Sequence, residues 1–278
     1  MASDFQNPSF AVTLSKFFED NNSIGLPRPN LFLEHLFTQL IKNFNSRNIK
    51  ETSKYAKFLK IYTWEKIYAK NYSEVRTEWF QIYSLVLFVE GFVLFDQEKD
   101  WKTSLNILDK ALLVGAPIYD KLVHRFVAHV KSCYSNEIRS LFTRFSDIQI
   151  KSTPISLPVS TKYGIKIPKM RISLFTFMND FYKKSPVVLL DGMNTWPAMT
   201  HRRWSLSYLS RIAAGRTVPI EIGSKYTDNN WHQKLMGIEE FVDNIAKNTG
   251  DLVYLAQHNL FTQIPELKED IMFRNIQL

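Results

Sequence analysis

The stretch VPIEIGSKYTDNNWHQKLM, residues 218–236, begins as a short run of β-type residues and ends in a polar turn rich in aromatic, amide and charged side chains. A second stretch of this kind, DLVYLAQHNLFTQIPELKED, covers residues 251–270. Short apolar runs bounded by turn residues are typical of buried strands. We therefore predict strands at 217–222 and 252–256, with polar side chains gathered where these strands end.

Outside these strands, apolar runs and residues that typically begin or end helices predict further elements. The apolar run at 186–190 is predicted to be a buried strand. Ser and Pro residues mark helix starts, and Gly marks a helix end. The predicted helices begin after Ser173, run from Ser205 to Gly215, cover 238–247, and enter PELKED through Pro265. Three strands alone leave unshielded edges, so this part of the core looks unfinished.

The first 145 residues read as almost wholly helical. Apolar residues recur at three- and four-residue steps, which indicates amphipathic helices joined by short connections. The clearest series are Leu33, Leu36, Phe37 and Leu40; Trp101, Leu105, Leu108 and Leu112, in a helix predicted to end at Gly115; and a long last helix from Tyr119 to Phe142. A helical bundle is the expected architecture.

One apolar window, Ile82–Phe95, is interrupted by Glu90 and Gly91 and is shorter than the roughly 20 residues that span a bilayer. It is predicted to be a buried helix, and no membrane association is expected. The N-terminus has neither the basic region nor the apolar region of a secretion signal. The chain has a single cysteine, which excludes an internal disulfide and fits a reducing compartment. We expect a nuclear or cytoplasmic protein that is not secreted.

The formal charge of +8 is concentrated between Lys42 and Lys70, where eight basic residues stand against two glutamates. Such a region can meet an acidic partner. It can equally be the solvated face of a helix, and this second reading is favoured. In the first reading, an acidic partner docks on Lys50, Lys54, Lys57 and Lys60. In the second reading, these lysines face solvent, and the buried face of the same helix carries Tyr55, Phe58, Leu59 and Tyr62. Arginine-rich clusters and glycine-aromatic repeats are absent, so direct nucleic-acid binding is not expected.

Residues 146–171 mix proline with Ser, Thr and Lys and have no helical period. This texture indicates a linker or an extended wrapping segment. The predicted organisation is therefore a helical domain at 1–145, the linker or wrapping segment at 146–171, and an α+β domain at 172–278.

Three segments carry a resemblance to a known family: PVVLLDGMNTWPAM, WSLSYLSRIAAGRTVPIEIGSKYTDNNW and LVYLAQHNLFTQIPELKEDI. In their order, spacing and residue identities, from about Ser173 to Ile271, these segments resemble the N-terminal half of a JmjC-domain oxygenase. The resemblance implies the first, incomplete part of a cupin-like double-stranded β-helix. It also implies iron(II) and 2-oxoglutarate as cofactors and hydroxylation of a side-chain carbon, in a family often called histone lysine demethylases.

The family holds its iron with a His-x-Asp/Glu pair and a distant His. None of the six histidines here has Asp or Glu two places later. In the family this triad lies downstream of the segment that matches QIPELKED. No residue is therefore nominated as a catalytic group or metal ligand. We expect a truncated gene model, a splice product or a fragment that is inactive alone and binds neither cofactor tightly.

The resemblance assigns roles to five strand-end residues. It implies that the Tyr254 hydroxyl donates a hydrogen bond to a 2-oxoglutarate carboxylate; the other reading is a core tyrosine. It places Glu221, Tyr226, Trp231 and Gln257 near the substrate. Glu221 is unusual inside an apolar strand unless it is paired or faces solvent. Its carboxylate could bind a guanidinium in bidentate fashion, with Tyr226 and Trp231 as aromatic flanks.

Three functions stay open on the sequence. The first is an arginyl hydroxylase that depends on iron(II) and 2-oxoglutarate and acts on a protein or peptide presenting Arg or Lys. The second is a non-catalytic helical interaction module whose basic face docks an acidic partner. The third is a JmjC enzyme that acts on methyl-lysine or nucleic acid.

Overall fold

A computed structural model describes residues 31–118, 121–141, 164, 166–223, 231–247, 252–255 and 257–272. These residues are mostly helical with a few short strands, as predicted for an α+β chain. Their contacts define two compact units. The first unit holds the described residues up to 141 and those between 213 and 259, and the second holds those between 164 and 212 and between 260 and 272.

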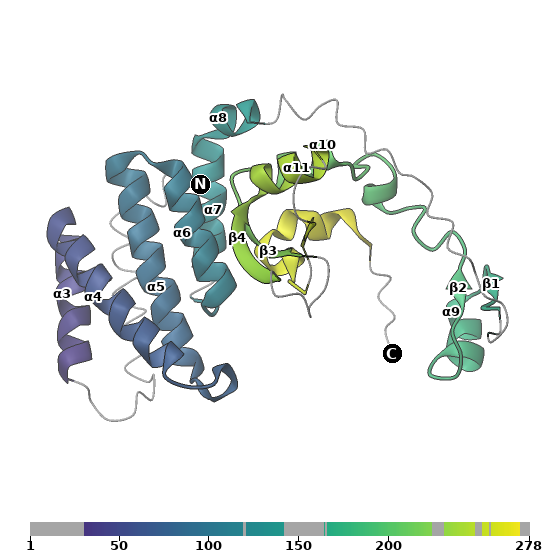
Figure 1. Ribbon diagram of the computed structural model, residues 1–278, viewed down its shortest axis with the longest axis horizontal. Helices are drawn as coiled ribbons and strands as arrows, with labels where there is room; N and C mark the ends of the chain where they lie inside the picture. The colour runs from purple at the N-terminus through teal and green to yellow at the C-terminus, as the bar shows by residue number, and fades with distance from the viewer. Residues whose placement is uncertain are drawn as a thin grey trace. The chain divides into compact units, whose positions relative to one another are not determined.

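The first unit is built on helices that pack as successive neighbours in the chain (Figure 1). They are α3 (Leu31–Asn45), α4 (Ile49–Tyr68), the 3₁₀ turn η2 (Tyr72–Glu74), α5 (Thr77–Val93), the π-helical turn η3 (Leu94–Glu98), α6 (Trp101–Val114), α7 (Leu122–Cys133) and α8 (Ser135–Ser140). The predicted helical character of the N-terminal part is confirmed for these residues.

Helix α5 is the centre of this packing, between α4 and α6. Ten of its seventeen residues are buried, so its apolar character serves the core, as predicted for the Ile82–Phe95 window. The continuous helix Thr77–Glu98 is nonetheless long and apolar enough, by length and composition, to span a membrane, with a mean hydropathy of 1.4. No other helix in the described part of the chain meets that test.

Side-chain caps fix where the neighbouring helices begin. The Asp100 carboxylate accepts a hydrogen bond from the Thr103 amide at 3.0 Å and so caps α6. Hydrogen bonding from Thr103 lowers the pKa of Asp100. Helix α6 ends at Gly115, where the sequence predicts its end. These local signals explain why the helix boundaries were predictable.

The prediction of one continuous last helix from Tyr119 to Phe142 is wrong about its continuity, because the described part contains two helices. The chain leaves the helical conformation at Tyr134, where φ is −111° and ψ is 31°, and separate helices α7 and α8 result. The ring of Tyr134 stacks on Trp101 at a centroid distance of 5.8 Å and meets Phe95 edge-on at 6.0 Å. This tertiary aromatic packing outweighs the continuity of the apolar pattern.

The predicted buried face of α4 is also corrected. Leu59 is fully buried, but Phe58 is 47% exposed, and Tyr55 and Tyr62 are only partly buried. The face that packs inward carries smaller residues between the aromatic ones: Thr52, Ala56, Leu59, Thr63 and Ile67. Helices α3 and α5 flank α4, and small residues allow helices to approach closely. The aromatic side chains therefore turn towards the surface.

A three-stranded antiparallel sheet in the order β4-β3-β5 completes the first unit. Its strands are β3 (Thr217–Ile222), β4 (His232–Gly237) and β5 (Val253–Tyr254), and helix α11 (Ile238–Lys247) follows β4. The predictions for β3 and α11 are confirmed, and β5 is shorter than predicted. Strand β4 was not predicted. Its side chains are mostly exposed, and it becomes a strand by pairing along the whole of β3.

The second unit contains short elements. They are β1 (Lys169–Met170), α9 (Leu174–Thr176), the π-helical turn η6 (Phe177–Phe181), β2 (Val188–Leu189), the 3₁₀ turn η7 (Pro197–Met199), α10 (Leu206–Ile212), α12 (Leu260–Gln263) and the 3₁₀ helix η8 (Pro265–Asp270). Ser173 and Ser205 cap the helices that follow them, and Pro265 opens η8, all as predicted.

The buried strand predicted at 186–190 is wrong about burial. Strand β2 pairs in parallel with the two residues of β1, but Val188, Leu189 and Leu190 are 41%, 49% and 40% exposed. An apolar run predicts burial only where another element covers it, and among the described residues the run is left open. Most of the predicted linker at 146–171 lies outside the described residues. The domain limits at 145 and 172 stay a prediction.

A buried ion pair joins helix α6 to the first strand of the sheet. Arg216 and Asp109 are 1% and 0% exposed, and the guanidinium Nη2 lies 2.6 Å from the Asp109 Oδ1 atom. The guanidinium Nε also donates to Asp109, at 3.0 Å, and the backbone amide of Thr217 donates to Asp109 Oδ2 at 2.6 Å. The Asn106 side chain adds a hydrogen bond to the Thr217 hydroxyl at 2.9 Å. The start of β3 is thus fixed on α6.

Asp109→Asn should lower the free energy of unfolding by about 3–5 kcal/mol, because it leaves a buried guanidinium without its counter-charge. Chemical denaturation followed by circular dichroism measures this change. The matched control is Arg76→Gln, which removes the surface ion pair of Arg76 with Glu78 and should change stability by less than about 1 kcal/mol. Equal effects of the two substitutions would show that the Asp109 pair has no special role.

Candidate functional site

The described residues include three buried carboxylates, and one of them lacks hydrogen-bond partners. Asp109, Asp270 and Glu221 are 0%, 0% and 2% exposed. Asp109 is satisfied by Arg216 and Thr217. Both oxygens of Glu221 are buried with no hydrogen-bond partner among the described residues. A buried carboxylate without hydrogen bonds carries a large desolvation cost, which a hydrogen-bond donor placed against it would lower.

Asp270 illustrates what a purely structural buried carboxylate looks like. It accepts hydrogen bonds from Arg202 Nη1 at 3.0 Å, from Trp204 Nε1 at 2.9 Å and from the Tyr208 hydroxyl at 2.7 Å. The hydrogen bond to Asp270 raises the pKa of Arg202, while burial and then the same carboxylate raise the pKa of Tyr208. Both shifts favour the protonated forms, which are the forms that donate to Asp270. The cluster ties η8 to the segment around α10.

Strand register places several of the predicted site residues on one face of the sheet. Glu221 pairs with Gln233 on β4 and with Tyr254 on β5, and residues directly opposite in an antiparallel pair share a face. Trp231 directly precedes β4 and lies against Gly223, so alternation continued from β4 puts it on the same face as Gln233. The opposite face carries Val218, Ile220 and Met236, which are 0%, 0% and 4% exposed. Glu221 is thus on the face away from these core residues.

Gly223 allows the strand to pass close to Trp231. Its φ is +117°, and a Cβ added there would lie 3.2 Å from the Trp231 Cα. Its amide donates to the Leu252 carbonyl at 3.0 Å, which holds β3 next to the entry of β5. A side chain at this position would be both strained and crowded. The glycine therefore helps to bring Trp231 alongside the end of β3.

The remaining predicted residues are placed less closely. Tyr254 is partly buried and lies directly beside Glu221. Gln257 is exposed and has a left-handed φ of 53°, three residues past Tyr254. Tyr226 lies outside the described residues, so its predicted role stays a prediction. Strand register therefore brings Glu221, Trp231 and Tyr254 onto one face, whereas Gln257 lies beyond β5 and has no register partner there.

Gln233 belongs to the same face and was not nominated from the sequence. It is exposed and stands directly opposite Glu221. The signal that could have found it is the hairpin register: once β3 and β4 are paired, Gln233 is the residue across from the buried carboxylate. Its amide can both donate and accept hydrogen bonds.

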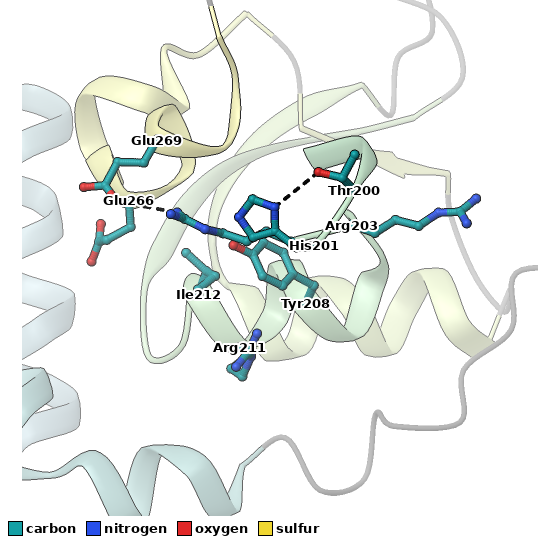
Figure 2. Close-up of a pocket in the computed structure, with 9 residues that line it drawn as sticks. Thr200, His201, Arg203, Tyr208, Arg211, Ile212, Glu266 and Glu269 are labelled. Atoms are coloured by element: carbon teal, nitrogen blue, oxygen red, sulfur yellow. Dashed lines mark hydrogen bonds and ion pairs between the residues drawn. The ribbon is translucent and has the colours of Figure 1, made fainter. Parts of the chain in front are cut away.

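A separate cavity of about 530 Å³ lies in the second unit, and Figure 2 shows its lining. The lining residues are Thr200, His201, Arg202, Arg203, Tyr208, Arg211, Ile212, Glu266 and Glu269, none of which was predicted as a site residue. Arg202 is neutralised by Asp270 and Glu269, and Arg203 and Arg211 point in different directions (Figure 2). Because its cations do not converge, this cavity is a weaker candidate than the face around Glu221.

The fit of a metal ion can be tested on the described residues. Within them there is no group of three or more His, Cys, Asp or Glu side chains that could hold an ion. Glu221 and Tyr254 together offer only one carboxylate and one phenol. The residues on this face therefore do not fit an iron centre.

Comparison with curated proteins identifies relatives of this chain. Lysine-specific demethylase 8 of Danio rerio is 35% identical over 76% of this chain and 54% of its own length. Lysine-specific demethylase 8 of Xenopus tropicalis is 32% identical over 76% of this chain and 58% of its own length. Jumonji C domain-containing protein 5 of Drosophila melanogaster is 31% identical over 75% of this chain and 52% of its own length. No protein-family model matches the chain.

These similarities show that the chain is homologous to the JmjC-domain proteins. The chain spans about half the length of these curated relatives. Within the class it resembles lysine-specific demethylase 8 and jumonji C domain-containing protein 5, as the sequence motifs indicated. The names of the relatives describe those proteins and do not by themselves give a substrate for this one.

Glu221→Met should raise the free energy of unfolding by about 1–3 kcal/mol, because an apolar side chain of similar shape removes a buried carboxylate that lacks hydrogen bonds. The measurement is a denaturant titration of the purified chain. Glu240→Met is the control, since Glu240 is exposed and paired with Lys234, and it should shift stability by less than about 0.5 kcal/mol. A loss of stability in Glu221→Met would mean that the carboxylate already has a partner.

Proposed function

We propose that this chain carries the substrate-binding face and part of the 2-oxoglutarate site of a JmjC-type protein hydroxylase that acts on arginine. The observation that carries the proposal is the buried Glu221 carboxylate, whose two oxygens lack partners among the described residues and which lies beside Tyr254 in strand register. The homology to JmjC-domain proteins supports an oxygenase, and the dependence on iron(II) and 2-oxoglutarate is part of the proposal.

The two acceptor oxygens of Glu221 favour arginine over methyl-lysine as the substrate side chain. A guanidinium offers parallel N–H groups that match both oxygens of one carboxylate, whereas a trimethylated ammonium has no N–H to donate. Glu221 needs both oxygens satisfied, so a bidentate partner relieves the whole desolvation cost. Trp231, on the same face, adds an aromatic surface for the cation. A trimethyl-lysine would leave the carboxylate without hydrogen bonds, and a monomethyl- or dimethyl-lysine lacks the planar pair of N–H groups that matches both oxygens.

The role proposed for Tyr254 is to orient the co-substrate. Its phenol can donate one hydrogen bond to a carboxylate of 2-oxoglutarate. Since it stands opposite Glu221, the co-substrate and the arginine would approach the same face of the sheet. The residues that would hold iron are not among those described, so the proposal assigns only binding and orientation to this chain.

An arginine-containing peptide should bind the chain about tenfold to a hundredfold more tightly than the same peptide with citrulline, because the charged hydrogen bonds to Glu221 contribute about 1.5–3 kcal/mol. Isothermal titration calorimetry measures the ratio. Glu221→Gln should abolish the preference, and Glu240→Gln should leave it unchanged. Equal binding of the two peptides to the unaltered chain would refute the proposed arginine specificity.

The chain incubated with ferrous iron, 2-oxoglutarate and the arginine peptide should give no succinate above the enzyme-free background. The reason is that no histidine of the sequence has Asp or Glu two places later, the pattern with which the family holds iron. Succinate is quantified by proton NMR, with a JmjC relative assayed in parallel as positive control. Sustained succinate formation would show that iron is held by residues outside that pattern.

A further inference from the structure

Helix α4 presents an exposed stripe with the spacing of a coiled-coil seam. Its members follow one another at steps of four and three residues: Lys50, Lys54, Lys57, Ile61, Trp64 and Tyr68. All six are exposed; Ile61, Trp64 and Tyr68 are 49%, 40% and 78% exposed. Steps of this kind keep side chains on one face of a helix over many turns. The stripe, here called the α4 seam, is about 27 Å long at 1.5 Å per residue.

The two halves of the α4 seam differ in chemistry. The first half carries the three lysines, and the second half carries Ile61, Trp64 and Tyr68. Lys54 is partly offset by Glu51 at 3.0 Å, whereas Lys50 and Lys57 have no acidic partner in the described part of the chain. Lys60, predicted as part of the same basic face, instead pairs with Glu90 at 2.7 Å and lies off the seam. The unbalanced charge is thus confined to the first half.

Aromatic rings of the apolar half contact one another and helix α5 within the chain itself. The ring of Trp64 lies 5.5 Å from the rings of both Tyr68 and Tyr83, and Tyr83 comes from the neighbouring helix α5. Trp and Tyr held in this way lose little conformational entropy on binding and are common anchors of interfaces. Exposed aromatic and aliphatic side chains in a contiguous row are unusual for a surface that faces only water.

A groove runs alongside the seam. A cavity of about 410 Å³ between α4 and α5 is lined by Lys57 and Ile61 of the seam and by the apolar residues Ala56, Val89, Val93 and Leu94. Glu90 and Glu98 also line it. The π-helical turn Leu94–Glu98, which continues α5, supplies one end of this groove. Apolar side chains of a partner would therefore find a concavity next to the row of exposed residues.

We propose that the α4 seam docks an amphipathic helix of a partner protein, with acidic side chains opposite Lys50, Lys54 and Lys57 and apolar side chains opposite Ile61, Trp64 and Tyr68. The spacing matches the packing of one helix along another, in which a stripe at steps of three and four residues faces the partner. Charge complementarity fixes the direction of the docked helix, because its acidic end must lie at the start of α4.

Two other occupants fit the surface less well. A second copy of this chain would bring lysines against lysines in a parallel pairing, and in an antiparallel pairing it would offer the lysines of the seam no acidic partner from its own seam. An anionic membrane would also attract the lysines. However, a membrane surface has no ridge of side chains to fill the groove between α4 and α5.

The test uses a fluorescein-labelled 21-residue peptide with glutamate at the seam positions of one half, leucine at those of the other, and alanine or glutamine elsewhere. Fluorescence anisotropy should show saturable binding that weakens as salt rises. Lys57→Glu and Tyr68→Ala should each weaken binding by at least about tenfold, since both residues lie on the seam. Lys70→Glu and Phe58→Ala are matched controls off the seam and should stay within about twofold.

Circular dichroism and thermal melting of each variant verify that the helices stay folded. Binding that is equally strong for a peptide with lysine in place of glutamate would overturn the proposal, as would the absence of saturable binding. Sedimentation of a dimer that Tyr68→Ala dissociates would assign the seam to a second copy instead. Co-sedimentation with vesicles that contain phosphatidylserine, lost in Lys57→Glu, would assign it to a membrane.

Discussion

The ion pair of Asp109 with Arg216 is the constraint on which the rest of the first unit depends. It joins residues that lie 107 positions apart and fixes the first residues of β3 against helix α6. Because side chains alternate along a strand, fixing Thr217 also decides which face receives Glu221 four residues later. The sheet then adds β4 and β5 on either side of β3. The position of the candidate site therefore follows from a buried contact with the helical part.

The same contact explains why the helical part and the sheet form one compact unit. The domain limits at 145 and 172 stay a prediction, but the described residues of α6 and β3 belong to one compact unit. Composition along the chain reflects the local preference for helix, strand or loop. Which elements form one compact unit depends on contacts between residues that are distant in sequence. Asp109 and Asn106 both lie on α6, and both bond to the start of β3. Such partners cannot be identified from spacing alone.

What could be predicted was local. Strand β3, helix α11, the caps at Ser173 and Ser205 and the end of α6 at Gly115 each depend on nearby residues, and each was predicted correctly. The misses all involve long-range packing. Strand β4 exists because it pairs with β3, the break at Tyr134 accompanies its stacking on Trp101, and Phe58 is exposed because small residues face the neighbouring helices.

The candidate site shows the same division. A glutamate inside an apolar strand is conspicuous, so Glu221 stands out from its neighbours in the sequence alone. Whether such a carboxylate is satisfied depends on its surroundings in the fold, and here the comparison with Asp109 and Asp270 decides it. All three are buried, and two have several donors each. Gln233 was missed because its place depends on the β3–β4 register.

Glu221 and the α4 seam are opposite departures from the usual rule of burial. Glu221 is a charged side chain buried without hydrogen bonds, whereas the α4 seam exposes aromatic and aliphatic side chains to water. Each raises the free energy of the folded chain alone, and neither is needed to hold the fold, because Asp109, Asp270 and the α5 core do that. A cation relieves the first and an apolar helix face relieves the second. Binding of a cation at Glu221 or of an apolar helix face at the α4 seam would therefore lower the free energy of the folded chain.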